Sequence, residues 1–116
     1  METPFSLVDS SIFGDPDFYS AIQNIMEYKQ FPKNHTIHKA GKICNHFYII
    51  VSGIARVYYI KDNKDITVHF AAEQQSITAV DSLFQQKKSK YNIESIEEVD
   101  AFAISINELE KIFNTE

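Results

Sequence analysis

The spacing of apolar residues in the first third of the chain predicts one amphipathic helix. Asp15 offers an acceptor for the free amides at a helix start, and Pro16 suits the first helical position. Apolar side chains then recur at helical spacing, at Phe18, Ile22, Ile25, Met26 and Tyr28. Pro32 bars Phe31 from helical angles and has no amide proton of its own, so the helix must end before it. We therefore expect a helix over about residues 16–29.

From Thr36 onward the apolar period changes to two, which is typical of half-buried strands. Runs rich in β-branched and aromatic residues occupy residues 47–51, 54–60, 66–70, 91–96 and 99–104. Gly53 closes the first run, and the polar residues 61–65 separate the second from the third, which predicts a hairpin with a long tip. Short strands at roughly even spacing predict a β-roll or barrel over about residues 34–105.

A terminal helix is predicted from about residue 106. Ser105 and Glu108 fit a capping box, in which the serine accepts from the third helical amide and the glutamate bonds back to the serine amide. The apolar face of this helix consists of Leu109, Ile112 and Phe113. The pattern therefore predicts a mainly β fold with flanking helices, organised as one domain over residues 1–116.

Composition adds limits on location and chemistry. The chain has 116 residues, of which 44% are hydrophobic and 23% charged, as in an ordinary folded domain. No apolar run approaches the ~20 residues of a membrane helix and the N-terminus lacks a basic stretch, so we expect a cytoplasmic protein without membrane contact. Cys44 is the only cysteine, which excludes an internal disulfide and leaves a thiolate zinc site without most of its ligands.

Charge narrows the partners. The net charge of −5 disfavours direct binding to nucleic acid, because a phosphate backbone repels an acidic chain. Arg56 is the only arginine among eleven cations, and arginine is the side chain whose planar fork binds phosphate through paired hydrogen bonds. The lysine-rich segment 87–90 lacks arginine and interleaved aromatic residues, which favours an exposed loop over a nucleic-acid contact.

Histidine and cysteine positions give little support to a catalytic or metal site. His35 and His38 lie three apart in a strand-like segment, so they face opposite sides of a sheet and cannot chelate one ion. The surroundings of His46 faintly resemble the metal motif of cupin barrels, but Tyr48 stands where a second histidine is needed. Cys44 beside His46 has the pairing that activates a thiol, yet a lone cysteine in a turn is more often inert. We expect no metal site, no cofactor and no catalysis; a small cupin-type metal-binding enzyme is the alternative, which a metal analysis distinguishes.

The order of the motifs resembles a known family. The segments concerned are residues 31–41, 47–58, 64–67, 89–98 and 104–109. Together they resemble the cyclic-nucleotide-binding domain of Crp/Fnr-type transcription regulators, with its basic turn ending in Gly41 and a strand pair that carries Gly53 and Arg56. The resemblance covers about residues 15–113. It implies a jelly-roll β-roll, a double-stranded β-helix, with a leading helix, a short helix in the phosphate-binding cassette and trailing helices.

Departures from the family pattern lie in that cassette. Ligand-competent members carry a Gly-Glu pair that binds the ribose and a later Arg-Ser/Thr pair that clamps the cyclic phosphate. This chain has Ala79 and Val80 near the first pair and Ser89 and Lys90 near the second. The resemblance therefore implies a sensory or regulatory domain that does not bind cyclic nucleotide in the usual way. The pocket residues that it implies are Val57, Val68, His69, Thr78, Ala79, Val80, Ser89, Lys90 and Tyr91.

The resemblance also bears on partners. Family members continue into a dimerisation helix and a helix-turn-helix, whereas this sequence ends at Glu116, so both a sensor portion of a longer regulator and a stand-alone domain are open. We expect a small-molecule effector in the β-roll, self-association through the C-terminal region, and no direct contact of this chain with DNA, which longer relatives bind through their C-terminal domain. A ligand-free interaction domain is a third alternative.

Overall fold

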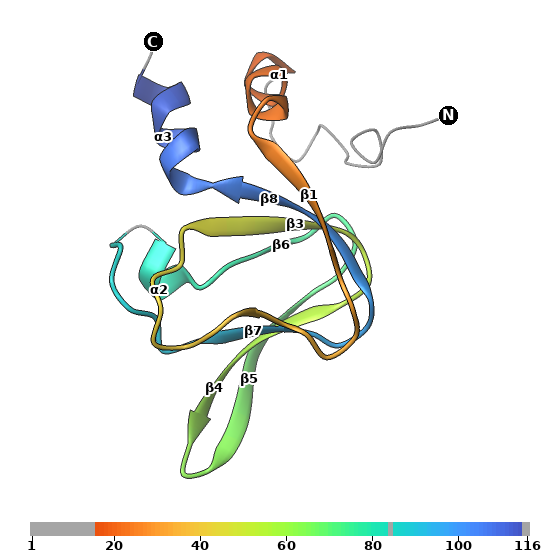
Figure 1. The fold of residues 1–116 in the computed structure, drawn as a ribbon, viewed down its shortest axis with the longest axis vertical. Coiled ribbons are helices and arrows are strands. Elements are labelled where there is room, and N and C mark those ends of the chain that lie inside the picture. The colour runs from red at the N-terminus through yellow and green to blue at the C-terminus, as the bar shows by residue number, and fades with distance from the viewer. Residues whose placement is uncertain (1–15, 84, 115–116) are drawn as a thin grey trace.

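Two antiparallel sheets form the body of the domain, and helices flank them (Figure 1). The computed structural model describes residues 16–83 and 85–114. The elements are α1 (Pro16–Gln23), β1 (Met26–Phe31), β2 (Thr36–His38), β3 (His46–Ser52), β4 (Ala55–Lys61), β5 (Lys64–Ala71), β6 (Ser76–Ile77), α2 (Val80–Leu83), β7 (Asn92–Ser95), β8 (Val99–Ser105) and α3 (Ile106–Asn114). One sheet has the strand order β1-β8-β3-β6 and the other β2-β7-β4-β5. The predicted mainly β fold with flanking helices is confirmed.

The core lies between the two sheets because alternate residues of a strand face opposite sides. Ile50 and Ala101 of the first sheet pack against Val57 and Ile93 of the second, and all four are buried. The other face of the first sheet carries a second buried cluster, in which Ile49, Val51, Phe102 and Ile104 pack with residues of α1 and α3. The two helices therefore cover the outer face of this sheet, at the end of the molecule opposite the β4–β5 hairpin (Figure 1).

The predicted helix over residues 16–29 is too long. The helix α1 ends at Gln23, and Met26–Phe31 forms strand β1, which pairs with β8 along its whole length. Met26 and Phe31 pack into different clusters, on opposite faces of the sheet, as the two-residue period of a strand requires. The apolar spacing fits a helix as well as a strand here, and pairing with a buried neighbour decides between them. The expected cap at Asp15 lies outside the described residues.

The β4–β5 hairpin also differs from its prediction. Pairing continues to Lys61 and Lys64, which leaves only Asp62 and Asn63 as the loop instead of a long tip. Both loop residues have positive φ, 54° and 63°, as in the tight turns that suit the twist of a hairpin. Aspartate and asparagine tolerate this conformation better than other non-glycine residues. Two residues therefore suffice for the turn, and the other three polar residues of this segment, Lys61, Lys64 and Asp65, lie in the strands.

The C-terminal helix begins at Ile106, where the capping pattern places it. The amide of Glu108 donates to the hydroxyl of Ser105 at 3.4 Å, which is one half of the expected capping box. The carboxylate of Glu108 accepts a hydrogen bond from Lys111 at 3.1 Å. No helix in the described part of the chain is long and apolar enough to span a membrane.

Candidate ligand pocket

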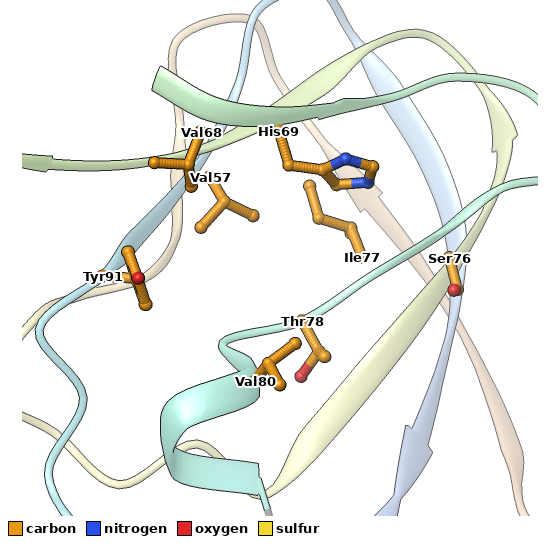
Figure 2. Close-up of a pocket in the computed structure, with 8 residues that line it drawn as sticks. All are labelled: Val57, Val68, His69, Ser76, Ile77, Thr78, Val80 and Tyr91. Atoms are coloured by element: carbon orange, nitrogen blue, oxygen red, sulfur yellow. The ribbon is translucent and has the colours of Figure 1, made fainter. Parts of the chain in front are cut away.

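A pocket of about 380 Å³ opens beside β5, β6 and the start of α2. Eight residues line it: Val57, Val68, His69, Ser76, Ile77, Thr78, Val80 and Tyr91. Figure 2 shows that they converge from different segments, with Val68 and His69 on the strand above and Thr78 and Val80 at the entry to the short helix below. The pocket therefore lies where strands of both sheets meet the segment that the sequence identifies as the cassette.

Six of the nine residues expected at the pocket are in its wall: Val57, Val68, His69, Thr78, Val80 and Tyr91. Ala79 and Ser89 are not; both are buried, with exposed fractions of 0% and 3%, and the hydroxyl of Ser89 bonds to Asp81 and to the amide of Tyr91 instead. Lys90 is exposed, and its ammonium nitrogen lies 5.2 Å from the centre of the Tyr91 ring, beside the pocket.

Sequence reasoning missed Ser76 and Ile77. They form the whole of β6, which pairs with β3 through Tyr48 opposite Ile77. A two-residue strand is too short to show alternation, and Ser76 ends a run of polar residues, 73–76. No signal in the sequence marks these residues as part of a pocket.

A β-bulge explains why two consecutive residues of β5 face the pocket. Val57 pairs with His69, but the next residue Tyr58 pairs with Thr67, so Val68 is the extra residue on its strand. Neighbouring residues of a regular strand point to opposite faces, and a bulge breaks that alternation. The bulge therefore adds Val68 to the same wall as His69.

The wall is mainly aliphatic with a few polar groups. Val57, Val68, Ile77 and Val80 supply hydrocarbon surface. Thr78 already donates to the carbonyl of His46 at 2.9 Å. The side chains of His69 and Tyr91 form no hydrogen bonds within the described part of the chain, so they offer the hydrogen-bonding groups that a ligand can use.

Hydrogen bonds hold the short helix α2 and the following loop in place. Ser82 is fully buried; its hydroxyl accepts from the amide of Cys44 at 2.8 Å and donates to the carbonyl of Lys87. Asp81 accepts a second set of bonds, from the hydroxyl of Ser89 at 2.7 Å and the amide of Lys90 at 3.0 Å. The segment that carries Val80 and the segment that leads to Tyr91 are therefore fastened to each other.

The carboxylate of Asp81 interacts electrostatically with His38, but His38 does not act as a cation. Burial lowers the pKa of His38 below its ordinary value and outweighs the opposing effect of the Asp81 carboxylate. Its Nε2 atom is buried and has no hydrogen-bond partner in the described segments. At neutral pH the imidazole is uncharged, so His38 supplies no positive charge to Asp81.

Arg56 is held on the other face of its sheet. Its guanidinium donates to Glu94 at 3.0 Å, Thr67 at 2.9 Å and Asp65 at 3.0 Å, and it lies 4.0 Å from the centre of the Tyr58 ring. Burial opposes its charge, but the bonds to Asp65 and Glu94 outweigh that effect and raise the pKa of Arg56 above its ordinary value. Val57, the next residue, faces the pocket, so strand alternation turns the chain's single arginine away from it.

Over residues 16–83 and 85–114, no three histidine, cysteine, aspartate or glutamate side chains gather closely enough to hold an ion.

Solved structures with the same fold include bacterial regulators and a eukaryotic kinase subunit. The catabolite activator protein of Thermus thermophilus matches with a TM-score of 0.79 and 13% identity, over 92% of this chain and 51% of that one. The sensor domain of the transcriptional regulator DNR from Pseudomonas aeruginosa matches with a TM-score of 0.76 and 11% identity, over 86% and 67%. The regulatory domain of Toxoplasma gondii PKA, solved with cAMP, gives 0.76 and 14%, over 84% and 37%.

These matches confirm the jelly-roll fold, which the chain shares with these regulators, and the chain spans about half of the length of the Thermus protein. No curated protein sequence matches the chain significantly. The family model described as "Cyclic nucleotide-binding domain" matches residues 28–116, which is most of the chain. The chain therefore belongs to the cyclic nucleotide-binding domain family.

Proposed function

We propose that this chain is a non-catalytic sensory domain whose pocket binds a small-molecule effector, and that cyclic AMP and cyclic GMP do not bind it in the family's usual way. The observation that carries the proposal is the pocket of about 380 Å³ whose wall contains neither arginine nor lysine. The only arginine of the chain is bound to Asp65 and Glu94 on the opposite face of the sheet.

The absence of arginine and lysine from the pocket wall matters because a cyclic phosphate carries a negative charge. A phosphate that leaves water for a pocket must regain its lost hydration from a cation or from converging amide donors. A cation beside this wall is the ammonium of Lys90, which lies 5.9 Å from the centre of the Tyr59 ring and 5.2 Å from that of the lining residue Tyr91. A lysine is a point charge without the paired donors of arginine, so it replaces only part of that contact.

Cyclic AMP and cyclic GMP are therefore expected to leave the melting temperature unchanged at sub-millimolar concentration. A ligand present at about one hundred times its Kd stabilises a protein by about 2.7 kcal/mol, which for a domain of this size raises the melting temperature by several degrees. Differential scanning fluorimetry measures this directly. A saturable rise of several degrees with either nucleotide would contradict the proposal.

We also propose that the domain acts in the cytoplasm as part of a larger assembly, with DNA contacted by a further domain. The acidic net charge of −5 supports the absence of direct DNA binding by this chain. Self-association through the C-terminal region is the expected mode of assembly. Sedimentation over a wide concentration range should show reversible association, and a strict monomer at high concentration would count against it.

A further inference from the structure

Two hydrogen-bond donors beside the pocket point at a carboxylate of the protein itself. The hydroxyl of Ser89 donates to Asp81 Oδ1 at 2.7 Å, and the amide of Lys90 donates to Asp81 Oδ2 at 3.0 Å. Asp81 follows the lining residue Val80 directly, and Lys90 precedes the lining residue Tyr91 directly. The carboxylate of Asp81 therefore occupies the donors that lie between the two segments of the pocket wall.

These donors have no capacity left for an anionic ligand. Ser89 is only 3% exposed, and its hydroxyl, with one proton to give, donates it to Asp81 while accepting from the amide of Tyr91 at 2.9 Å. Hydrogen bonds to an ionised carboxylate are stronger than those between neutral groups, so this arrangement resists displacement. An anion that enters the pocket also meets the negative charge of Asp81 nearby.

The remaining wall suits an uncharged molecule. Its aliphatic side chains favour a ligand with an apolar body, because burying that body removes hydrocarbon surface from water on both sides. His69 and Tyr91 lie at the pocket without hydrogen bonds to other described residues, so they accommodate one polar group of a ligand.

We infer that Asp81 acts as an internal anion that makes the pocket selective for uncharged, mainly apolar small molecules carrying one hydrogen-bonding group, and that it rejects anions of the same shape. This inference rests on the proposed function of the pocket as an effector site.

A pair of probes of nearly equal shape tests the inference: cinnamamide, which is neutral, and cinnamate, which is ionised at neutral pH. Isothermal titration calorimetry on the intact chain should show saturable binding of cinnamamide. The Kd of cinnamate should be higher by a factor of about ten or more. Asp81→Asn removes the charge and keeps one acceptor, so cinnamate should gain affinity and the difference should fall below about threefold.

Asp62→Asn is the matched control. It changes the net charge by the same amount in the β4–β5 loop, where asparagine suits the positive φ of 54°. This variant should keep the discrimination of the wild type. Equal binding of both probes by the wild type, or an equal gain of cinnamate affinity in Asp62→Asn, would overturn the inference and leave the proposed effector site intact.

The salt dependence of the wild type gives a second test that does not depend on how Asp81→Asn folds. If Asp81 dominates the field in the pocket, cinnamate binding should tighten as salt is raised, because salt screens the repulsion. If Lys90 dominates, cinnamate binding should weaken, which would overturn the inference. Failure of both probes to bind at millimolar concentration would overturn the inference and the proposed function together.

Discussion

Gly53→Ala is expected to destabilise the domain by about 3 kcal/mol or more. Gly53 has a φ of +92°, and a Cβ atom added there would lie 2.1 Å from the carbonyl oxygen of Glu98. That oxygen belongs to the backbone just before β8, so it cannot rotate away as a side chain would. The variant must shift either the β3–β4 turn or the start of β8.

Gly41→Ala is a matched control for this prediction. Gly41 has almost the same φ, +93°, but no heavy atom lies within 4 Å of a Cβ added there. Its cost should come from the backbone conformation alone, about 1 kcal/mol. Urea denaturation of both variants measures the difference, and equal losses of stability would show that the close approach at Glu98 is not what requires glycine at residue 53.

Ile50→Ala is expected to reduce the free energy of unfolding by about 2–5 kcal/mol, because it leaves a cavity between the two sheets. Ile50 has an exposed fraction of 0% and packs in the central cluster with Val57, the residue that also lines the pocket. Its backbone holds the turn before β6 through bonds with Gln74 and Gln75 at 2.8 Å and 2.9 Å, and those bonds do not depend on the side chain.

Ile60→Ala makes the same chemical change at a position that is 64% exposed, so its stability should stay within about 0.5 kcal/mol of the wild type. Chemical denaturation of both variants measures their free energies of unfolding. Because both replace isoleucine by alanine, the difference between them reports the burial of the side chain. A comparable loss in both would contradict the assignment of the core to the space between the sheets.

The sequence predicted most strands and the C-terminal helix because their periods are long enough to be unambiguous. It failed at residues 24–29, where Ile25, Met26 and Tyr28 fit a helix and a strand equally well, and only the pairing of β1 with β8 decides. It also failed at residues 61–65, which were expected to form a long loop. Strand pairing includes Lys61, Lys64 and Asp65, so only two residues form the loop. In both cases a contact distant in sequence outweighs the local pattern.

The lining residues of the pocket were predictable where the family motifs determine their place in the fold. They were not predictable where contacts specific to this chain determine it. Six of the expected residues line it, because the resemblance fixes which strands and which cassette residues meet. The places of Ser89 and Lys90 were not predictable, since they depend on the bonds that Asp81 makes to residues eight and nine positions away. The turned-away Arg56 follows from strand alternation once Val57 is known to face the pocket.

A two-dimensional nitrogen–proton NMR titration of the labelled chain tests the central claim most directly. With cinnamamide, saturable shifts are predicted for the amides of Val57, His69, Ile77 and Tyr91, whose residues line the pocket, and the same amides should stay unchanged with cyclic AMP at sub-millimolar concentration. The opposite result, in which cyclic AMP moves these amides saturably and cinnamamide does not, would contradict the account.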